Sequence, residues 1–251
     1  MRMKVRIAAA ESAGSYHSKN GIPCQDKTGI NIDEEAAIAV ISDGAGSKSY
    51  AEQSADMIVS AAIDYFKTIS KELSAITEDS FRSGLAETIY GRFGSKNVDE
   101  YGGTLVLAAV TENCLFTAHM GDGIIIKLDN SGESVLSAPE NGEYSNMSFF
   151  FPGSSEEHLR VSKHKIYGDF TLILASDGIS DLIFSSSEDR AAPICRKFEM
   201  WNQSFEPEEA GKIYEDNLNG IFSKYSSDDK SIAVISVRDT SREEYTGDAE
   251  P

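Results

Sequence analysis

Aspartates stand at the ends of several short apolar segments of this chain. Asp43 follows the run AAIAVIS, Asp177 follows TLILAS, and Asp122 separates LFTAHM from IIIKL. Asp228 precedes the run SIAVISV, and Asp26 begins the weaker segment DKTGI. Short apolar runs bounded by Gly and Asp are typical of buried strands rather than of helices. The chain is therefore expected to form a sheet core whose strand ends carry carboxylates.

The order of the predicted elements indicates the fold class. Apolar and β-branched segments predict strands at residues 4–10, 26–32, 36–42, 104–110, 115–120, 124–128, 161–166, 171–175 and 231–237. Apolar residues spaced by three and four predict helices at residues 50–66 and 77–93, and a later helix is expected at 210–222. Strands in quick succession argue against a doubly wound parallel sheet and favour stacked sheets with helices outside.

Polar stretches predict the connections between these elements. Residues 11–25 and 139–160 are expected to be loops, and Gly168-Asp169 is expected to join two paired strands. The aromatic cluster at residues 149–151 could form a partner surface, but a loop packed on its own sheet is favoured. Trp201 is interpreted as a packing residue.

Charge and hydropathy exclude several function classes. The chain has 23 Lys and Arg against 41 Asp and Glu, a net charge of −18. This balance argues against a nucleic-acid partner, whose phosphates need clustered basic residues, and against an anionic membrane surface. The longest apolar runs are too short to span a membrane. The apolar run near the N-terminus breaks at Glu11, which favours a first strand over a signal peptide.

Cysteine usage and length bound the compartment and the domain count. Cys24, Cys114 and Cys195 are far apart and form no C-x-x-C, which argues against a disulfide framework and a thiolate zinc site. A reducing, cytoplasmic location is expected. No composition shift divides the 251 residues, so residues 1–238 are expected to form one domain, with 239–251 as a flexible tail.

The aspartates at strand ends are expected to bind divalent cations. Each has a simpler explanation when taken alone, such as a hairpin turn at Asp122-Gly123 or a strand-end cap at Asp228. If they gather in space, however, like-charge repulsion opposes the arrangement unless a cation lies among them. Oxygen ligands without a His or Cys cluster select magnesium, manganese or calcium.

Other common sites are not indicated by the sequence. No segment has the Asp spacing of an EF-hand, and neither a P-loop nor a G-x-S-x-G elbow occurs. The histidines have no paired ligand spacing, so each is expected to be structural or exposed: His17, His119, His158 and His164.

Several motifs resemble, in order, those of the metal-dependent type-2C Ser/Thr protein phosphatases. Gln25-Asp26 resembles the early Asn-Glu/Gln-Asp element, and SDGAG at 42–46 resembles Asp-Gly-x-Gly. Gly103-Thr104 and HMGD at 119–122 resemble the Gly-Thr strand and the Gly-Asp-Ser turn. ASDG at 175–178 and SDDKS at 227–231 resemble the last two elements. The stretches GIPCQD, SDGAGS and GEYSN favour a divergent bacterial branch.

The resemblance implies a fold, an activity and a cofactor. The fold is α+β, a four-layer α-β-β-α sandwich of two mainly antiparallel sheets flanked by helices. The activity is hydrolysis of phosphoserine or phosphothreonine in a protein substrate of a Ser/Thr kinase, by a hydroxide that bridges two divalent cations. The cofactors are two, and with a weaker site three, Mn²⁺ or Mg²⁺ ions.

The resemblance also implies a role for each matched residue. Asp43 would bridge two ions, and the carbonyl oxygen of Gly44 would bind one of them. Asp177 and Asp228 would hold the other, so that these two and Asp43 support catalysis through the bound hydroxide. Asp122 would help to hold the weaker ion, and Asp26, like Gln25, would act through water. The full set of implied metal-site residues is Asp43, Gly44, Asp177, Asp228, Asp122 and Asp26.

Two departures from the family pattern keep an alternative open. Many members have an Arg five residues before the early Asp, where this chain has Gly21; Lys19 is nearby and is the candidate phosphate-binding residue. Eukaryotic members often have His where Ala45 stands, so a metal-bound water is the expected proton donor. The alternative is a catalytically weak pseudophosphatase that acts as a regulatory binding module. A third hypothesis is a non-catalytic calcium-binding β protein.

Overall fold

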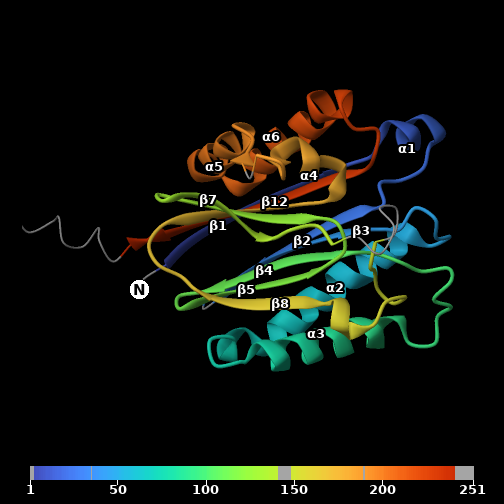
Figure 1. Ribbon diagram of the computed structural model, residues 1–251, viewed down its shortest axis with the longest axis horizontal. Coiled ribbons are helices and arrows are strands. Elements are labelled where there is room, and N and C mark those ends of the chain that lie inside the picture. Colours follow the sequence, from blue (N-terminus) through green and yellow to red (C-terminus); the bar gives the residue numbers. More distant parts are fainter. Residues whose placement is uncertain (1–2, 35, 141–147, 189, 241–251) are drawn as a thin grey trace, which may run out of the picture.

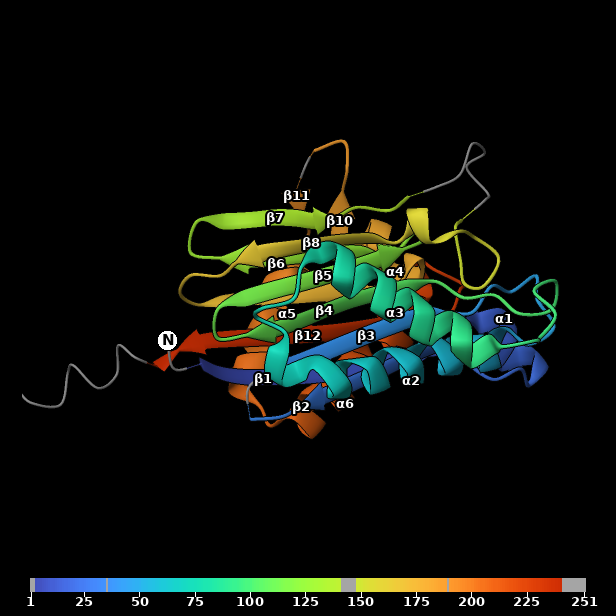
Figure 2. The same ribbon diagram turned by 90° about the horizontal axis from the view of Figure 1, so that it is seen from below.

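Two stacked five-stranded sheets form the centre of the molecule (Figures 1 and 2). The computed structural model describes residues 3–34, 36–140, 148–188 and 190–240. The strand order is β1-β12-β9-β6-β7 in the first sheet and β2-β3-β4-β5-β8 in the second. Every pairing in these two sheets is antiparallel. The predicted α+β sandwich is confirmed.

The strands follow the predicted apolar segments closely. The first sheet consists of β1 (Met3–Ser12), β12 (Lys230–Asp239), β9 (Phe170–Ala175), β6 (Ile124–Asp129) and β7 (Gly132–Ser137). The second consists of β2 (Asp26–Ile32), β3 (Ala36–Asp43), β4 (Leu105–Thr111), β5 (Cys114–Met120) and β8 (Arg160–Lys165). A short pair is formed by β10 (Phe184–Ser185) and β11 (Arg190–Ala191).

Helices cover both outer faces of the sandwich (Figure 1). The second sheet is covered by α2 (Ala51–Ile69) and α3 (Glu78–Phe93), and the first by α4 (Asp177–Ile183), α5 (Ile194–Ser204) and α6 (Pro207–Gly220). The short α1 (Ser15–Asn20) lies at one end of the molecule. Single 3₁₀ turns are η1 (Ser70–Glu72), η2 (Glu156–His158) and η3 (Phe222–Lys224). None of the helices in the described ranges is long and apolar enough to cross a membrane.

Burial on both faces explains why the central strands are apolar throughout. Ile41, Val106, Leu172 and Ile235 pack between the sheets and are fully buried. Their neighbours along each strand point outward, but the helices cover them as well. A strand buried on both faces therefore has no polar alternation, and this is the pattern by which the sequence revealed β3, β4, β9 and β12.

The layer between α3 and the second sheet offers a test of core packing. Phe116 on β5 is fully buried and stacks on Phe81 of α3, with ring centroids 4.6 Å apart. Phe116→Ala is expected to lower the free energy of unfolding by about 3–5 kcal/mol, because it leaves a cavity that the sheet cannot close. Urea denaturation measures the loss. Tyr167→Ala, at a position 76% exposed, is the control, and equal effects of the two changes would contradict this account of the core.

One strand pairing expected from turn residues is wrong, and the alternative of a hairpin turn at Asp122-Gly123 is not found either. Residues 161–166 and 171–175 were expected to pair around Gly168-Asp169, but β8 belongs to the second sheet and β9 to the first. The Gly121–Gly123 turn likewise joins β5 to β6, which lie in different sheets. A crossing between sheets needs the same turn residues as a hairpin, so the local sequence does not distinguish the two. Asp122 consequently lies between the sheets rather than in a hairpin.

The predicted loops contain more structure than expected. The segment 11–25 contains α1, and α4, α5 and β7 were not predicted. In the described part of 139–160, Phe151 is fully buried and exchanges two 2.9 Å backbone hydrogen bonds with Gly103, so this segment packs on its own sheet. Trp201 is partly buried against Phe198, as predicted. The GEYSN motif and residues 241–251 of the predicted tail lie outside the described residues.

Candidate metal centre

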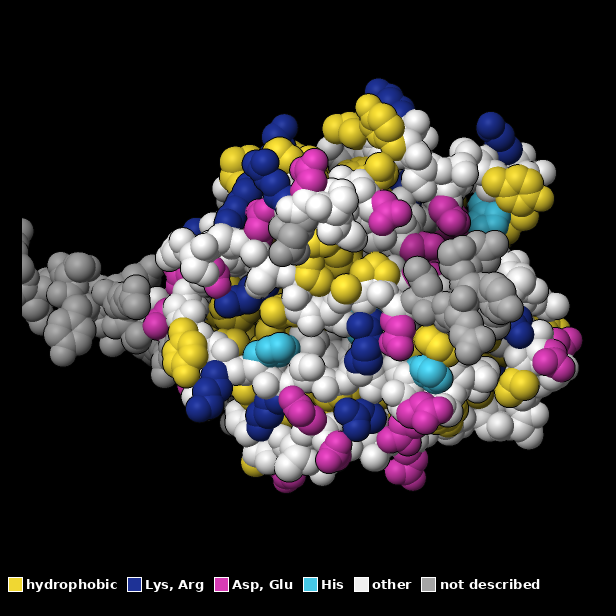
Figure 3. Space-filling model, in the orientation of Figure 1, with side chains coloured by type: hydrophobic (Ala, Val, Ile, Leu, Met, Phe, Trp, Pro, Cys, Tyr) yellow, Lys and Arg dark blue, Asp and Glu magenta, His cyan; other side chains and the backbone are white. Residues whose placement is uncertain are grey.

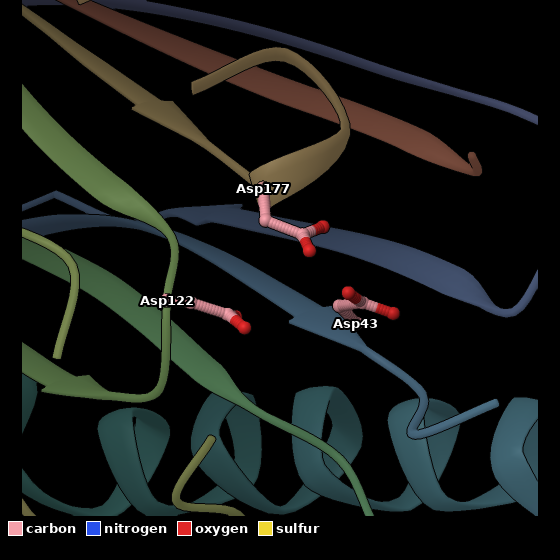
Figure 4. A group of neighbouring side chains, drawn as sticks. All are labelled: Asp43, Asp122 and Asp177. Carbon is pink, nitrogen blue, oxygen red and sulfur yellow. The ribbon is translucent and has the colours of Figure 1, made fainter. Parts of the chain in front are cut away.

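Three aspartates from distant parts of the chain meet at one end of the sandwich. Asp43 is the last residue of β3, Asp122 lies on the crossing from β5 to β6, and Asp177 is the first residue of α4. Figure 4 shows the three side chains directed toward a common space. A carboxylate oxygen from each lies within 4.8 Å of one from each of the others. The two sheets thus bring together acids that are up to 134 positions apart (177 minus 43).

The electrostatics of this group favour a bound cation. Burial and then the charges of Asp26, Asp177 and Asp122 raise the pKa of Asp43 well above its ordinary value. Desolvation, followed by the charges of Asp122 and Asp228, raises the pKa of Asp177 to about 7, although its side chain stays open to solvent. Such a group must either retain protons or bind cations. Its oxygen-only donor set fits Mg²⁺, Mn²⁺ or Ca²⁺.

Asp26 lies directly behind Asp43. The two residues face each other in the β2–β3 register, an arrangement that like charges destabilise. Asp26 is fully buried, and burial raises its pKa to about 6. Ser231 donates a 2.7 Å hydrogen bond to Oδ2, whereas Oδ1 is buried without a hydrogen-bond partner among the described residues. An orphaned buried oxygen at this place suits a water molecule or an ion.

The backbone around Asp43 is held on both sides. Its N–H donates to Thr104 Oγ1 at 3.0 Å, and the N–H of Thr104 donates to its carbonyl at 2.8 Å. The next residue, Gly44, has no room for a side chain, since a Cβ would lie 2.4 Å from the carbonyl oxygen of Ala51. This close approach explains the Asp-Gly pair at the end of β3. Binding of a metal by the Gly44 carbonyl stays a prediction.

A serine pair connects the Asp177 turn to Asp26. The N–H of Ser231 donates to Ser176 Oγ at 3.0 Å, and Ser231 Oγ in turn donates to Asp26. A Cβ on Gly178 would lie 1.9 Å from the carbonyl oxygen of Asp229, so α4 rests directly on the segment before β12. Neither serine was recognised from the sequence as functional. Their only signal was adjacency to the aspartate motifs.

Asp122 is held by a residue that sequence reasoning missed. The hydroxyl of Ser148 donates to Asp122 Oδ2, and the aspartate remains partly exposed. Ser148 follows immediately after the undescribed residues 141–147, and nothing in its local sequence marks it as a partner of Asp122.

Asp228 is not a member of the close acidic group in the part of the chain described. Its side chain is exposed, although its charge helps to raise the pKa of Asp177. The Nζ of Lys230 donates to the Asp228 backbone carbonyl. Its neighbour Asp229 is the buried member of the pair, at 3% exposure. Metal ligation by Asp228 therefore stays a prediction, and Asp229 is a residue that the sequence reasoning passed over.

The α1 segment carries two basic side chains, those of His17 and Lys19. The side chain of Lys19 is exposed and makes no hydrogen bond or ion pair within the described residues. His17 instead contacts the carboxylate of Asp229, with Nδ1 2.9 Å from each oxygen. Gln25 bridges the same region through its backbone, since its carbonyl accepts from the Gly44 N–H at 3.1 Å. Phosphate binding by Lys19 stays a prediction.

Comparisons with known proteins agree with this geometry. A family model described as protein phosphatase 2C matches residues 13–222, and no curated protein sequence matches. The structure is similar to the catalytic domain of the Ser/Thr phosphatase PstP, solved with two manganese ions (15% identity, TM-score 0.63, 95% of this chain and 100% of that one). It is also similar to PppA, a key regulatory component of T6SS in Pseudomonas aeruginosa. The identity is 19% and the TM-score 0.63, and the match covers 94% of this chain and 99% of that one. A third similar structure is RsbX in complex with magnesium, with an identity of 13% and a TM-score of 0.58 over 94% of this chain and 98% of that one. At these identities the likeness shows the fold.

Proposed function

Because the chain belongs to the protein phosphatase 2C family, we propose that it is a metal-dependent phosphatase that hydrolyses phosphoserine or phosphothreonine in proteins. The observation that supports this most directly is the convergence of Asp43, Asp122 and Asp177 within 4.8 Å. We propose that residues 1–238 form the phosphatase domain. Three free cysteines support a cytoplasmic location.

The cations proposed for this site are manganese or magnesium, the ions bound in PstP and RsbX. Asp43 would contact two ions, with the Gly44 carbonyl at one, and Asp177 with Asp228 at the other. Asp122 would help hold a further ion, and Asp26 would act from behind Asp43 through water. When bound, such ions lower the pKa of a water molecule and neutralise charge on the phosphoryl oxygens.

The protein's own charge explains why ions are required for substrate binding. A net charge of −18 and a group of carboxylates both repel a phosphate dianion. On the face drawn in Figure 3, Lys and Arg side chains are interspersed with Asp and Glu. Attraction of the phosphoryl group therefore has to arise locally, from cations held by the acids and from basic side chains on α1.

A reconstitution experiment tests the function. Protein freed of metal with a chelator is given Mn²⁺, its metal content is measured by elemental analysis, and phosphate release from a phosphothreonine peptide is followed. Turnover is expected only in the reconstituted sample. If the folded, metal-loaded protein shows no turnover, the phosphatase function is refuted and the regulatory pseudophosphatase is favoured. Gly21 and Ala45, which replace the Arg and His of other family members, support that alternative. Calcium retention without hydrolysis would favour the calcium-binding protein.

Lys19→Ala tests the assignment of the substrate phosphate. If Lys19 binds the phosphate as a point charge, its removal is expected to raise KM about three- to tenfold with little change in kcat. Steady-state kinetics on the phosphothreonine peptide measure both constants. The matched control is Lys71→Ala. Lys71 is exposed and lies beside Thr111, at the end of β4 away from Asp43. Kinetics unchanged from those of the wild type would reject a phosphate-binding role for Lys19.

A further inference from the structure

His17 and Asp229 form a hydrogen-bonded pair beside the acidic group. The Nδ1 atom of His17 lies 2.9 Å from both carboxylate oxygens of Asp229. The side chain of His17 is 17% exposed and that of Asp229 is 3% exposed. A histidine anchored in this way by a buried carboxylate has a set ring orientation, the arrangement used where imidazole transfers protons.

The other contacts of Asp229 determine which nitrogen of His17 bears hydrogen. Asp229 Oδ1 accepts from the N–H of Gly14 at 2.6 Å, and Oδ2 accepts from the N–H of Gln25 at 2.5 Å. A carboxylate that accepts on both oxygens has no hydrogen to donate, so Nδ1 of His17 must be the donor in this pair. The second ring nitrogen, Nε2, is left for another partner.

Nε2 of His17 is accessible. It has no hydrogen-bond partner among the described residues. Because it is also absent from the buried polar atoms that lack a partner, it must be exposed to solvent. Solvent or a ligand can therefore reach it. The ring thus presents a free nitrogen at the surface, whereas its other nitrogen is committed to a buried carboxylate.

The pair is tied to the same segments as the metal centre. Asp229 follows Asp228, whose charge acts on Asp177. Gln25, which donates to Asp229, also accepts a hydrogen bond from Gly44 and precedes Asp26. In Figure 1, α1 lies at the same end of the molecule as the end of β3 that carries Asp43. A substrate phosphoryl group at the acidic site would therefore lie at the same end of the molecule as α1.

We propose that His17, in place of the metal-bound water expected from the sequence, is the proton donor to the leaving oxygen of the substrate and that Asp229 is its positioning residue; this rests on the proposed function. In the step, the oxygen of a water molecule forms a bond to phosphorus, and the bond from phosphorus to the serine or threonine Oγ breaks. The electron pair of that bond goes to Oγ, which takes the proton from Nε2 of the doubly protonated ring and leaves neutral His17 with its hydrogen on Nδ1. The proton lost by the water passes to solvent, from which the imidazole is protonated again.

The leaving group distinguishes a proton donor from other roles. An alkoxide is a poor leaving group and needs the proton, whereas p-nitrophenolate leaves without one. His17→Asn keeps a side-chain N–H for Asp229 and removes the transferable proton. It is expected to lower kcat about 100-fold or more on the phosphothreonine peptide but only about threefold or less on p-nitrophenyl phosphate.

Controls separate this proposal from a simple loss of structure or of phosphate binding. His164→Gln changes a histidine paired with Leu115, at the end of β5 remote from Asp122, and is expected to leave both rates unchanged. Equal losses on the two substrates, or a rise in KM alone, would overturn the proton-donor role. Wild-type protein without turnover would refute the proposed function itself.

A spectroscopic readout tests the pair in metal-free protein. Nitrogen-15 spectra of the histidine rings are expected to show the neutral ring of His17 protonated at Nδ1, and Asp229→Asn is expected to remove that preference. The same variant should lower kcat on the peptide more than on p-nitrophenyl phosphate, to a smaller extent than His17→Asn. A neutral His17 protonated at Nε2 in the wild type would contradict the inferred geometry.

Discussion

Asp43→Asn is expected to abolish measurable turnover while the protein keeps its fold. Asp43 faces Asp26 across the sheet and shares the acidic group with Asp122 and Asp177. Asparagine keeps the shape of the side chain, and the backbone hydrogen bonds to Thr104 do not involve the carboxylate. The change therefore removes a charge that cations need and that the metal-free fold does not, because the charge is repelled by its neighbours.

The experiment compares two Asp→Asn variants. Asp56→Asn, at an exposed position on α2, is the matched control and is expected to retain wild-type kinetics. Circular dichroism confirms folding, and thermal denaturation with and without Mn²⁺ reports binding independently of activity. The wild type and the control are expected to gain thermal stability with Mn²⁺, whereas Asp43→Asn gains little. An Asp43→Asn variant with most of the wild-type activity would contradict the assignment.

The metal-free protein is expected to lose stability as the pH rises from about 6.5 to about 8. Below this range His119, whose pKa burial lowers from 6.5 to about 3, changes the stability in the opposite direction. The pKa of Asp26 is raised to about 6 and that of Asp177 to about 7, from 3.8. At pH values between 3.8 and these raised pKa values, the folded protein holds protons that the unfolded chain has released. The stabilisation from these protons is complete below pH 3.8 and is lost as the pH rises through 6 and 7. The sign is the reverse of that for a carboxylate in a salt bridge.

Divalent cations are expected to reverse this loss. At neutral pH they replace the protons among the carboxylates, and a cation present at 100 times its Kd adds about 2.7 kcal/mol to the free energy of unfolding. Urea denaturation at a series of pH values, with chelator and with Mn²⁺, measures both effects. The Asp43→Asn variant is the comparison, because it keeps the general repulsion among the other acidic residues of the chain. Its free energy of unfolding is expected to depend less on pH than that of the wild type. A wild type whose metal-free stability rises with pH above 6.5, where His119 no longer contributes, would contradict the raised pKa values.

The fold class could be predicted because its main signals are local. Strands such as β3 and β12 are buried on both faces, so their sequences are apolar throughout, and α2 shows the spacing of a helix with one buried face. Both patterns are set by the geometry of a few consecutive residues. The Asp-Gly pairs could also be read from the sequence, but their cause is tertiary in part, since Gly44 lies against the backbone of Ala51 and Gly178 against that of Asp229, where a side chain does not fit.

Strand partners and the charge pattern of the site depended instead on long-range packing. The turns after β5 and β8 look like hairpin turns, yet both carry the chain from one sheet to the other, because each sheet is completed by strands from distant parts of the sequence.

The pair formed by His17 and Asp229 joins positions separated by 212 residues. The sequence established which acids stand at strand ends and that they are suited to hard cations. Folding alone selected which of them meet, because a separation of a few ångströms in space depends on how two sheets stack and leaves no trace in the spacing of the residues along the chain.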